Sequence, residues 1–325
     1  AYFHYLTPRR DDAAEAKLFD ELADANDSTR YVGGIIRPSA IHRGLEWVSQ
    51  AVDGTGKAAD TVFRNVLLEG TARLTFSQPE EDRSGWLLKV GAFEPDFEVD
   101  AASVIVTDKQ GQRWRLPKGS PAFDQPFPTG WPRGIREAVS ERFLANLHGT
   151  FYEIPRWGEQ AVPDFSKMKP VCSHNKLIAD FCTWRGLFVM SGARIGAKQD
   201  GQFFSGDDGR GLWFGTIDDL WKLGKPRGQG GPWKDTSVKA GERSDPYLMA
   251  GYDRKTLALS YNADTAAEFV VEVDVTGGGH WVVYDAFTIA PTEAFVHHFH
   301  EGYQARWLRL TASRDCAATA WLRYE

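Results

Sequence analysis

The sequence predicts an all-β chain, built as a propeller-like array of antiparallel four-stranded blades, with two β-sandwich domains as the alternative. Short runs rich in β-branched and aromatic residues recur at even spacing with turn residues between them, which is typical of sandwiches, barrels and propellers. About seven clusters of such runs, each about 40–50 residues long, suit propeller blades of four strands. A chain of 325 residues, 42% of them hydrophobic, is long enough for one large β domain or two ordinary ones.

The N-terminal region departs from this β pattern. Residues 11–24 read DDAAEAKLFDELAD, in which Leu18, Phe19 and Leu22 form a narrow apolar stripe. The two aspartates at the start suit the positive end of a helix dipole. We therefore expect an N-terminal helical segment at residues 1–30 and a propeller-like domain at residues 31–325.

Strand-like runs make up most of the rest of the chain. The alternation in residues 306–310, RWLRL, is that of a strand with one exposed and one buried face. A motif of Glu-Val-Asp, a glycine turn and a tryptophan strand occurs twice, ending at Trp114 and at Trp281, so one antiparallel meander is used more than once. Strands are expected at 32–36, 45–48, 62–68, 72–76, 86–90, 97–100, 104–107, 114–117, 142–154, 177–181, 187–190, 212–217, 247–250, 256–261, 268–275, 281–289, 295–299, 306–312 and 317–324.

Composition excludes several classes of protein. A net charge of −6 and a pI of about 5.8 do not indicate a nucleic-acid partner, because nucleic-acid-binding domains are usually basic. No run of about 18 apolar residues is present, so no membrane span is expected. The chain has no GxGxxG motif followed by a helix, no P-loop, no HExxH and no GxSxG, which disfavours nucleotide binding, serine hydrolase and zincin chemistry.

Cysteine and histidine residues give no sign of a cofactor or metal. Cys172, Cys182 and Cys316 are odd in number, so a complete disulfide framework is impossible and buried free thiols are expected. Of His297, His298 and His300, only the last two would share a strand face. No signal peptide is visible at Ala1; since a mature chain would have lost one, we expect a periplasmic or extracellular location.

The candidate site lies in residues 173–247, where strand-like runs give way to a polar, glycine-rich segment, Gly224 to Lys239, expected to be a loop. A glycoside hydrolase needs two carboxylates, about 5 Å apart for retention and further apart for inversion. Asp218 and Asp219 follow a strand, so only one of them would face the site, and the alternative is that one caps a turn. The candidate catalytic carboxylates are Asp218 and Asp219, with Asp180, Asp245, Glu153 and Asp207 as possible second members of the pair.

A lyase that removes a proton next to a uronate carboxylate would need a base and cations instead. His174 and Tyr247 are candidate bases, and Arg185, Lys222 and Arg227 are candidate cations. The alternative for His174 is a histidine bonded to the backbone at a strand end.

Tryptophans are the most distinctive residues, with twelve in the chain. They are either core residues or flat surfaces for a sugar ring. Trp233 lies between Pro232 and Lys234, which predicts partial exposure and contact with an acidic sugar whose carboxylate meets a cation. The candidate substrate-binding residues are Arg185, Trp213, Trp221, Lys222, Arg227, Trp233 and Lys234.

Two phrases in the second half carry a resemblance to a known group of proteins. Residues 212–226 read LWFGTIDDLWKLGKP, and the C-terminal part contains ARWLRL and ATA. The chain from His174 onward resembles β-propeller carbohydrate-active proteins of bacterial polysaccharide-utilisation systems. The resemblance implies a site on a propeller face and an oligosaccharide or polysaccharide partner containing rhamnose or uronate. No catalytic motif of such proteins matches here.

The sequence thus predicts a glycoside hydrolase acting on an acidic or rhamnose- and uronate-containing polysaccharide. Two alternatives stay open: a polysaccharide lyase that cleaves at a uronate by β-elimination, and a non-catalytic glycan-binding propeller. No cofactor is expected for any of the three.

Overall fold

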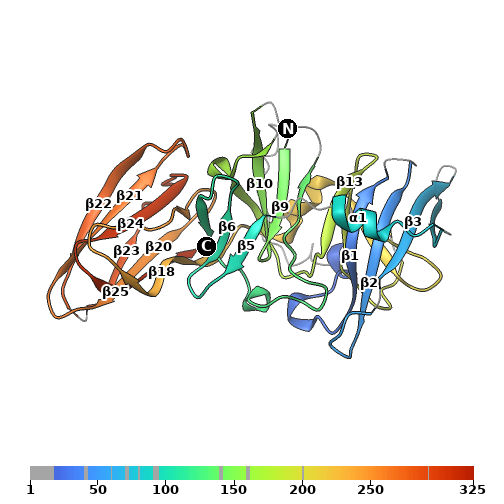
Figure 1. The fold of residues 1–325 in the computed structure, drawn as a ribbon, viewed down its shortest axis with the longest axis horizontal. Helices are drawn as coiled ribbons and strands as arrows, with labels where there is room; N and C mark the ends of the chain where they lie inside the picture. Colours follow the sequence, from blue (N-terminus) through green and yellow to red (C-terminus); the bar gives the residue numbers. More distant parts are fainter. Residues whose placement is uncertain are drawn as a thin grey trace. The chain divides into compact units, whose positions relative to one another are not determined.

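The computed structural model describes residues 18–39, 43–59, 61–69, 73–79, 81–90, 95–138, 142–158, 162–199, 201–291 and 293–325. Nearly all regular structure is β-strand, which confirms the predicted all-β class (Figure 1). Contacts divide the chain into two compact units. Unit 1 comprises Ala1–Glu94, Ser120–Phe151 and His174–Lys225, and unit 2 comprises Pro95–Gly119, Tyr152–Ser173 and Pro226–Glu325. The predicted division into an N-terminal segment, 1–30, and a domain, 31–325, stays a prediction.

Unit 1 contains two antiparallel sheets of the size of a propeller blade. The first has the order β15-β1-β2-β3-β4 and the second the order β13-β14-β17-β16. Their strands are β1 (Arg30–Pro38), β2 (Leu45–Asp53), β3 (Val62–Glu69), β4 (Arg73–Ser77), β13 (Asp180–Trp184), β14 (Leu187–Ser191), β15 (Ala193–Arg194), β16 (Phe203–Ser205) and β17 (Gly211–Gly215).

An apolar core holds these two sheets together. Trp47 and Val32 of the first sheet share a buried cluster with Trp184, Val189 and Phe214 of the second. Burying a large apolar side chain stabilises a fold by about 1.5–3 kcal/mol, so this cluster is a main source of stability in unit 1. The stacking of blade-like sheets agrees with the predicted architecture.

Unit 1 also contains a pair of short strands and several short 3₁₀ helices. The hairpin of β8 (Ile135–Glu137) and β9 (Arg142–Leu147) leads through His148 and Gly149 into β10 (Thr150–Trp157). Both turn residues have positive φ, 51° and 75°, as a type I′ turn requires. Short 3₁₀ helices lie at η3 (Ala25–Asp27), η4 (Pro121–Phe123) and η6 (Ile217–Leu223).

The strand prediction for residues 86–90 is wrong, because this segment is the helix α1 (Ser84–Val90). Asp82 accepts a hydrogen bond from the Ser84 amide at 2.8 Å and so supports the helix start. Leu87 packs on Val48 and Phe63 while Trp86 is exposed. A run of five residues is too short for its pattern to distinguish a strand from a helix.

The predicted N-terminal helix fails where it can be judged. Residues 11–17 lie outside the described residues, and residues 18–24 form a 3₁₀ turn and isolated bridges. The Ala23 amide donates to the Gly192 carbonyl at 2.9 Å and the Ala25 amide to the Asn175 carbonyl at 2.8 Å. These tertiary backbone bonds replace helical ones, so packing overrides the local propensity.

Unit 2 contains a four-stranded antiparallel sheet, β18-β25-β20-β23, and a seven-stranded sheet, β22-β21-β24-β19-β7-β6-β5. All seven strands predicted after residue 246 are confirmed. The strands of these sheets are β5 (Asp96–Val99), β6 (Val104–Thr107), β7 (Arg113–Leu116), β18 (Gly228–Val238), β19 (Tyr247–Leu248), β20 (Lys255–Asn262), β21 (Ala267–Asp274), β22 (Trp281–Ile289), β23 (Phe295–His298), β24 (Trp307–Ala312) and β25 (Cys316–Tyr324). The shorter elements β11 (Val162–Pro163), η5 (Phe165–Lys167) and β12 (Lys169–Ser173) also belong to unit 2.

The two sheets of unit 2 pack face to face. Alternate residues of β20 and β25 are buried, among them Leu257 and Leu322, while their neighbours lie on the outer face. The Tyr261 ring lies 5.4 Å from that of Phe269 on the facing sheet, and Tyr324 lies 6.0 Å from Tyr247. Each sheet therefore has an inner, apolar face and an outer face available for other roles.

The expected loop from Gly224 to Lys239 is wrong, since most of it is the long strand β18. A Cβ on Gly231 would lie 1.7 Å from the Ala320 carbonyl oxygen, and one on Gly230 would lie 2.4 Å from the Ala102 oxygen. The glycines thus allow close backbone approach at a bulge instead of forming a loop.

Candidate functional site

Apart from Glu153 and Asp207, the thirteen predicted site residues divide between the two units. Eight belong to unit 1 and five to unit 2, because the stretch 173–247 passes from unit 2 to unit 1 after Ser173 and back after Lys225. The unit 1 residues are His174, Asp180, Arg185, Trp213, Asp218, Asp219, Trp221 and Lys222. Those of unit 2 are Arg227, Trp233, Lys234, Asp245 and Tyr247.

Asp180 is buried between two arginines. Its Oδ2 accepts from Arg37 Nη1 at 2.7 Å and from the Ile36 amide at 2.9 Å, while Arg136 Nη2 lies 2.7 Å from Oδ1. Breaking a buried ion pair by removing one partner is strongly destabilising. This geometry gives Asp180 the role of joining β1, β8 and β13.

Asp219 caps the 3₁₀ helix η6. Its Oδ2 accepts from the Thr216 amide at 2.7 Å and hydroxyl at 3.1 Å, and Lys222 Nζ lies 3.0 Å from Oδ1. This arrangement is a capping box. Asp219 therefore has the capping role that was the alternative to catalysis for one of the two aspartates. Asp218 is exposed and Trp221 half-buried on the same helix.

His174 has both ring nitrogens engaged. The Lys176 amide donates to Nδ1 at 3.2 Å, so Nε2 carries the proton and donates to Asn146 Oδ1 at 3.0 Å. Burial lowers the pKa of His174 to about 3, and the rings of Phe123 and Phe151 pack against it. No lone pair is left for a substrate proton, and the alternative of a backbone-bonded histidine fits this geometry.

The remaining unit 1 residues are a core tryptophan and a turn arginine. Trp213 is fully buried, and its Nε1 donates to the Leu18 carbonyl at 2.9 Å. Arg185 has φ 53° and with Gly186 forms the two-residue turn between β13 and β14. Its guanidinium lies 5.8 Å from the Trp184 ring.

In unit 2, Asp245 and Tyr247 lie close together in sequence but differ in surroundings. Asp245 Oδ2 accepts from Arg113 Nε at 3.2 Å and Arg115 Nε at 3.0 Å. Tyr247 is fully buried, and burial raises its pKa well above the usual value. Arg227 is exposed, and its amide donates to Ser173 Oγ at 2.9 Å.

The prediction that Trp233 is partly exposed is wrong, because only 5% of it is accessible. Trp233 lies opposite Ala320 in the register of β18 and β25, on the inner face of the sheet. Lys234, the next residue, is exposed, and its Nζ lies 5.5 Å from the Trp321 ring. The cation therefore meets an aromatic ring, but on the neighbouring strand and on the outer face.

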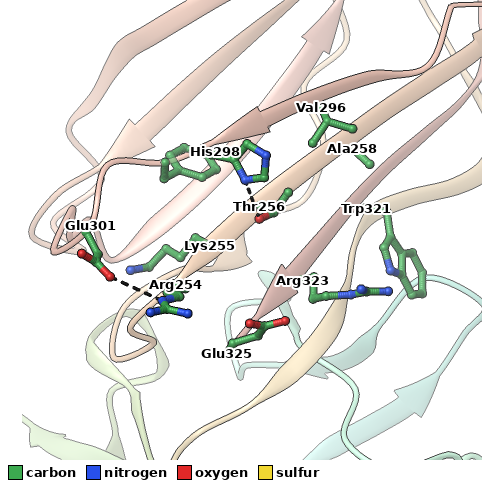
Figure 2. Close-up of a pocket in the computed structure, with 11 residues that line it drawn as sticks. Arg254, Lys255, Thr256, Ala258, Val296, His298, Glu301, Trp321, Arg323 and Glu325 are labelled. Carbon is green, nitrogen blue, oxygen red and sulfur yellow. Dashed lines mark hydrogen bonds and ion pairs between the residues drawn. The ribbon is translucent and has the colours of Figure 1, made fainter.

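A groove of about 590 Å³ crosses this outer face, and we call it the Trp321 groove. Figure 2 shows Thr256 and Ala258 from β20 lying between the side chains of β23 and β25. Its lining is Arg254, Lys255, Thr256, Ala258, Val296, His298, Phe299, Glu301, Trp321, Arg323 and Glu325.

The groove combines an aromatic ring, hydrogen-bonding groups and an excess of cations. Thr256 Oγ1 and His298 Nδ1 lie 3.2 Å apart, and Arg254 Nε lies 3.4 Å from Glu301 Oε1 (Figure 2). Arg323 is exposed two residues from Trp321 on the same strand face. A half-buried ring beside cations is suited to a ligand with a flat apolar face and a negative charge.

The groove has one buried cation in its floor. Lys255 Nζ donates to the carbonyls of Tyr252 at 2.6 Å and Tyr303 at 2.8 Å. Burial lowers the pKa of Lys255 to about 8. Because the Lys255 ammonium donates to these two backbone carbonyls, it would act on a bound ligand through its positive charge and not through a direct hydrogen bond.

Sequence reasoning missed Trp321 and Arg323, although a signal for them was present. In residues 317–324, Ala318, Ala320 and Leu322 alternate with the larger side chains Trp321 and Arg323. Period-two alternation places both on one face, opposite the buried residues. Applying this test to every C-terminal strand would have found them.

The other groups considered for a metal or a disulfide have ordinary surroundings. His297 Nε2 lies 2.9 Å from the Tyr284 hydroxyl on the inner side of β23, while His298 is on the outer face. Cys172 and Cys182 are buried and form no disulfide, as predicted, whereas Cys316 is only half-buried. Burial raises the pKa of Cys182. Within the described part of the chain, no helix is long and apolar enough to cross a membrane.

Comparison with known proteins gives only remote likenesses. No family model and no curated protein matches the chain. A glycoside hydrolase structure is 9% identical over 93% of this chain and 85% of its own, with a TM-score of 0.22. An exo-β-1,3-galactanase from Phanerochaete chrysosporium with galactose has 9% identity, coverage of 93% and 83%, and a TM-score of 0.19.

A glycoside hydrolase family 43 arabinoxylan arabinofuranohydrolase from Bacillus subtilis, in complex with cellotetraose, is 7% identical over 90% of this chain and 78% of its own, with a TM-score of 0.18. At these TM-scores the likenesses carry no argument about the function of this chain.

Proposed function

We propose that this is a carbohydrate-active protein and that the Trp321 groove binds an acidic glycan. The observation that supports this is the half-buried indole of Trp321, with Lys234 Nζ 5.5 Å from its ring and exposed Arg323 on the same strand face. The indole offers a flat apolar surface to the C–H face of a sugar ring. The two cations lie where a uronate carboxylate or a sulfate could reach them.

The lining of the groove favours an acidic sugar over an apolar ligand. Arg254, Lys255 and Arg323 outnumber the carboxylates of Glu301 and Glu325. Thr256 and His298 supply groups that can exchange hydrogen bonds with sugar hydroxyls. Such convergent polar groups around an aromatic surface are typical of small-molecule sites.

Glycoside hydrolysis remains a prediction from the sequence and forms the second part of the proposal. Asp180 and Asp219, two of the predicted carboxylates, are engaged in an ion-pair cluster and a helix cap. The geometry therefore supports glycan binding more directly than catalysis. A rhamnose- or uronate-containing substrate and a location outside the cytoplasm belong to the same proposal.

The binding test is a titration of the whole chain with a galacturonate tetrasaccharide. We expect Trp321→Ala to weaken binding by about 1–3 kcal/mol, or roughly 5–150-fold, as for loss of a central aromatic contact. Arg323→Gln should weaken it less and reduce its dependence on salt. Trp86→Ala is the matched control, because exposed Trp86 also has an arginine, Arg83, 4.5 Å from its ring.

Equal affinities of wild type and Trp321→Ala for every acidic glycan tried would contradict the proposed groove. Catalysis is tested separately by incubating the chain with a panel of plant and algal polysaccharides. Hydrolysis releases reducing ends, whereas a lyase also forms an unsaturated uronate that absorbs ultraviolet light. Binding without either product would leave the glycan-binding alternative.

A further inference from the structure

A second cleft lies on the outer face of the seven-stranded sheet of unit 2. It measures about 650 Å³, and we call it the Trp281 cleft. Its walls are the turn at 108–112, the segments 162–167 and 244–246, and the turn at 277–279. A Cβ on Gly277 would lie 2.1 Å from the Ser166 carbonyl oxygen, so two of these walls touch through their backbones.

Two indole rings in this cleft are held in fixed orientations. The Arg309 guanidinium lies 4.2 Å from the Trp281 ring centre, and Arg309 Nε donates to Glu272 Oε2 at 2.8 Å. Trp114 packs 4.6 Å from Trp307 and donates from Nε1 to Asp108 Oδ2 at 2.9 Å. Rings fixed before binding lose little conformational entropy when a ligand arrives.

The two tryptophans come from the two copies of the repeated sequence motif. Trp114 lies in β7, after the first Glu-Val-Asp, and Trp281 in β22, after the second. Both copies contribute to the same seven-stranded sheet and to the same cleft. The repetition in the sequence therefore places one aromatic ring on each side of one site.

The charge of this cleft is opposite to that of the Trp321 groove. Its lining has four aspartates and two cations, Lys167 and Arg309. Asp245 is ion-paired to Arg113 and Arg115, so Asp108, Asp164 and Asp274 carry the remaining excess of negative charge. Asp274 is fully occupied, since it accepts the amides of Thr276, Gly277, Gly278 and Gly279. The Gln110 backbone N–H donates to Asp108 Oδ1 at 3.0 Å. Among the described residues, Asp164 Oδ2, Asp245 Oδ1 and the side-chain amide of Gln110 make no hydrogen bond, so they can accept from or donate to a ligand.

We infer that the Trp281 cleft binds a neutral, hydroxyl-rich sugar. Carboxylate oxygens accept hydrogen bonds from sugar hydroxyls, the Gln110 amide can serve both directions, and the indoles cover the apolar face of the ring. An acidic sugar would meet an excess of negative charge and is disfavoured. Unit 2 thus has two glycan sites of opposite charge preference, a statement that rests on the proposed function of the Trp321 groove.

The test is a titration of the full chain with neutral tetrasaccharides of glucose, galactose, xylose or arabinose, beside the galacturonate tetrasaccharide. At least one neutral sugar should bind wild type, and Trp281→Ala should weaken it at least 10-fold with acidic binding unchanged. Trp321→Ala should show the reverse pattern. Gln110→Ala, a change of an exposed side chain that does not threaten folding, should weaken neutral binding about 3-fold.

Each outcome decides the matter. Failure of all four neutral sugars to bind wild type, or equal losses in Trp281→Ala and the Trp86→Ala control, would overturn the Trp281 cleft as a site. Loss of acidic binding in Trp321→Ala alone would still support the Trp321 groove, so the two proposals fail separately. Melting temperatures of all variants show whether a loss reflects unfolding.

Discussion

Trp233 and Trp321 lie on neighbouring strands of one sheet, yet they have opposite roles. Trp233 of β18 is buried opposite Ala320, while Trp321 of β25 is half-exposed on the outer face with Lys234 nearby. Sequence context favoured Trp233 as the exposed residue, because glycines, a proline and cations surround it. The comparison teaches that polar neighbours in sequence do not decide which face of a strand a side chain takes.

The bulges of β18 decide the orientation of Trp233. The register with β25 shifts between Gly230 and Trp233 and again between Trp233 and Thr236. Each bulge inserts residues that have no partner, and so it changes which side chains point inward. Simple alternation counted from either end of β18 therefore does not give the face of Trp233.

The largest expected effect concerns Trp233 itself. Trp233→Ala should lower the free energy of unfolding by about 3–5 kcal/mol, because it removes a large buried side chain and leaves a cavity. Urea denaturation of wild type and variant measures this difference. A loss under about 1 kcal/mol would mean that Trp233 is at the surface, as the sequence predicted, and that the comparison is reversed.

Gly231→Ala should come next, with a loss of up to about 3 kcal/mol from forced displacement of β18 against β25. The Cβ would lie 1.7 Å from the carbonyl oxygen of Ala320, a residue that also pairs with Leu259 of β20 in the same sheet. Gly201→Ala is the matched control, since a Cβ there meets nothing within 4 Å and should change stability by about 0.5 kcal/mol or less. Equal losses of stability in Gly231→Ala and Gly201→Ala would contradict the close backbone approach at the bulge, and with it the role of the bulge in orienting Trp233.

Buried His174 should make the stability of the fold depend on pH. The pKa of His174 is about 3 in the folded chain and about 6.5 when unfolded, so between these values the unfolded state binds more protons. The contribution of neutral, buried His174 to the free energy of unfolding is present above pH 6.5. It is lost as the pH falls, and the loss is about 2 kcal/mol at pH 5. His174→Gln should flatten the stability profile between pH 7 and 5, and an unchanged profile would contradict a buried, neutral His174.

Trp321→Ala should have the smallest effect on folding, about 1 kcal/mol or less, because the ring is half-exposed on the outer face of the sheet. The same urea titration used for Trp233 measures it. A loss of unfolding free energy as large as that of Trp233→Ala would show that Trp321 is a core residue. Weaker glycan binding by Trp321→Ala could then be explained by unfolding alone.

The sequence alone determined the β class and most strand positions, since period-two alternation and turn residues are local properties of the chain. The seven strands after residue 246 follow from it, as do the paired motifs that end at Trp114 and Trp281. Buried free thiols at Cys172 and Cys182 were also predictable from number and residue type.

Tertiary structure alone decided which predicted residues are accessible. Asp180, Asp219 and His174 are residue types found in catalytic sites, but other residues occupy their polar atoms. Asp180 binds Arg37 and Arg136. Asp219 binds Thr216, and His174 binds Asn146. Those partners are distant in sequence for Asp180 and His174, and no local pattern announces them. The grooves arise in the same way, because β20, β23 and β25 become neighbours only through the pairing of the sheet, and side chains from separate strands must meet before a surface can bind a ligand.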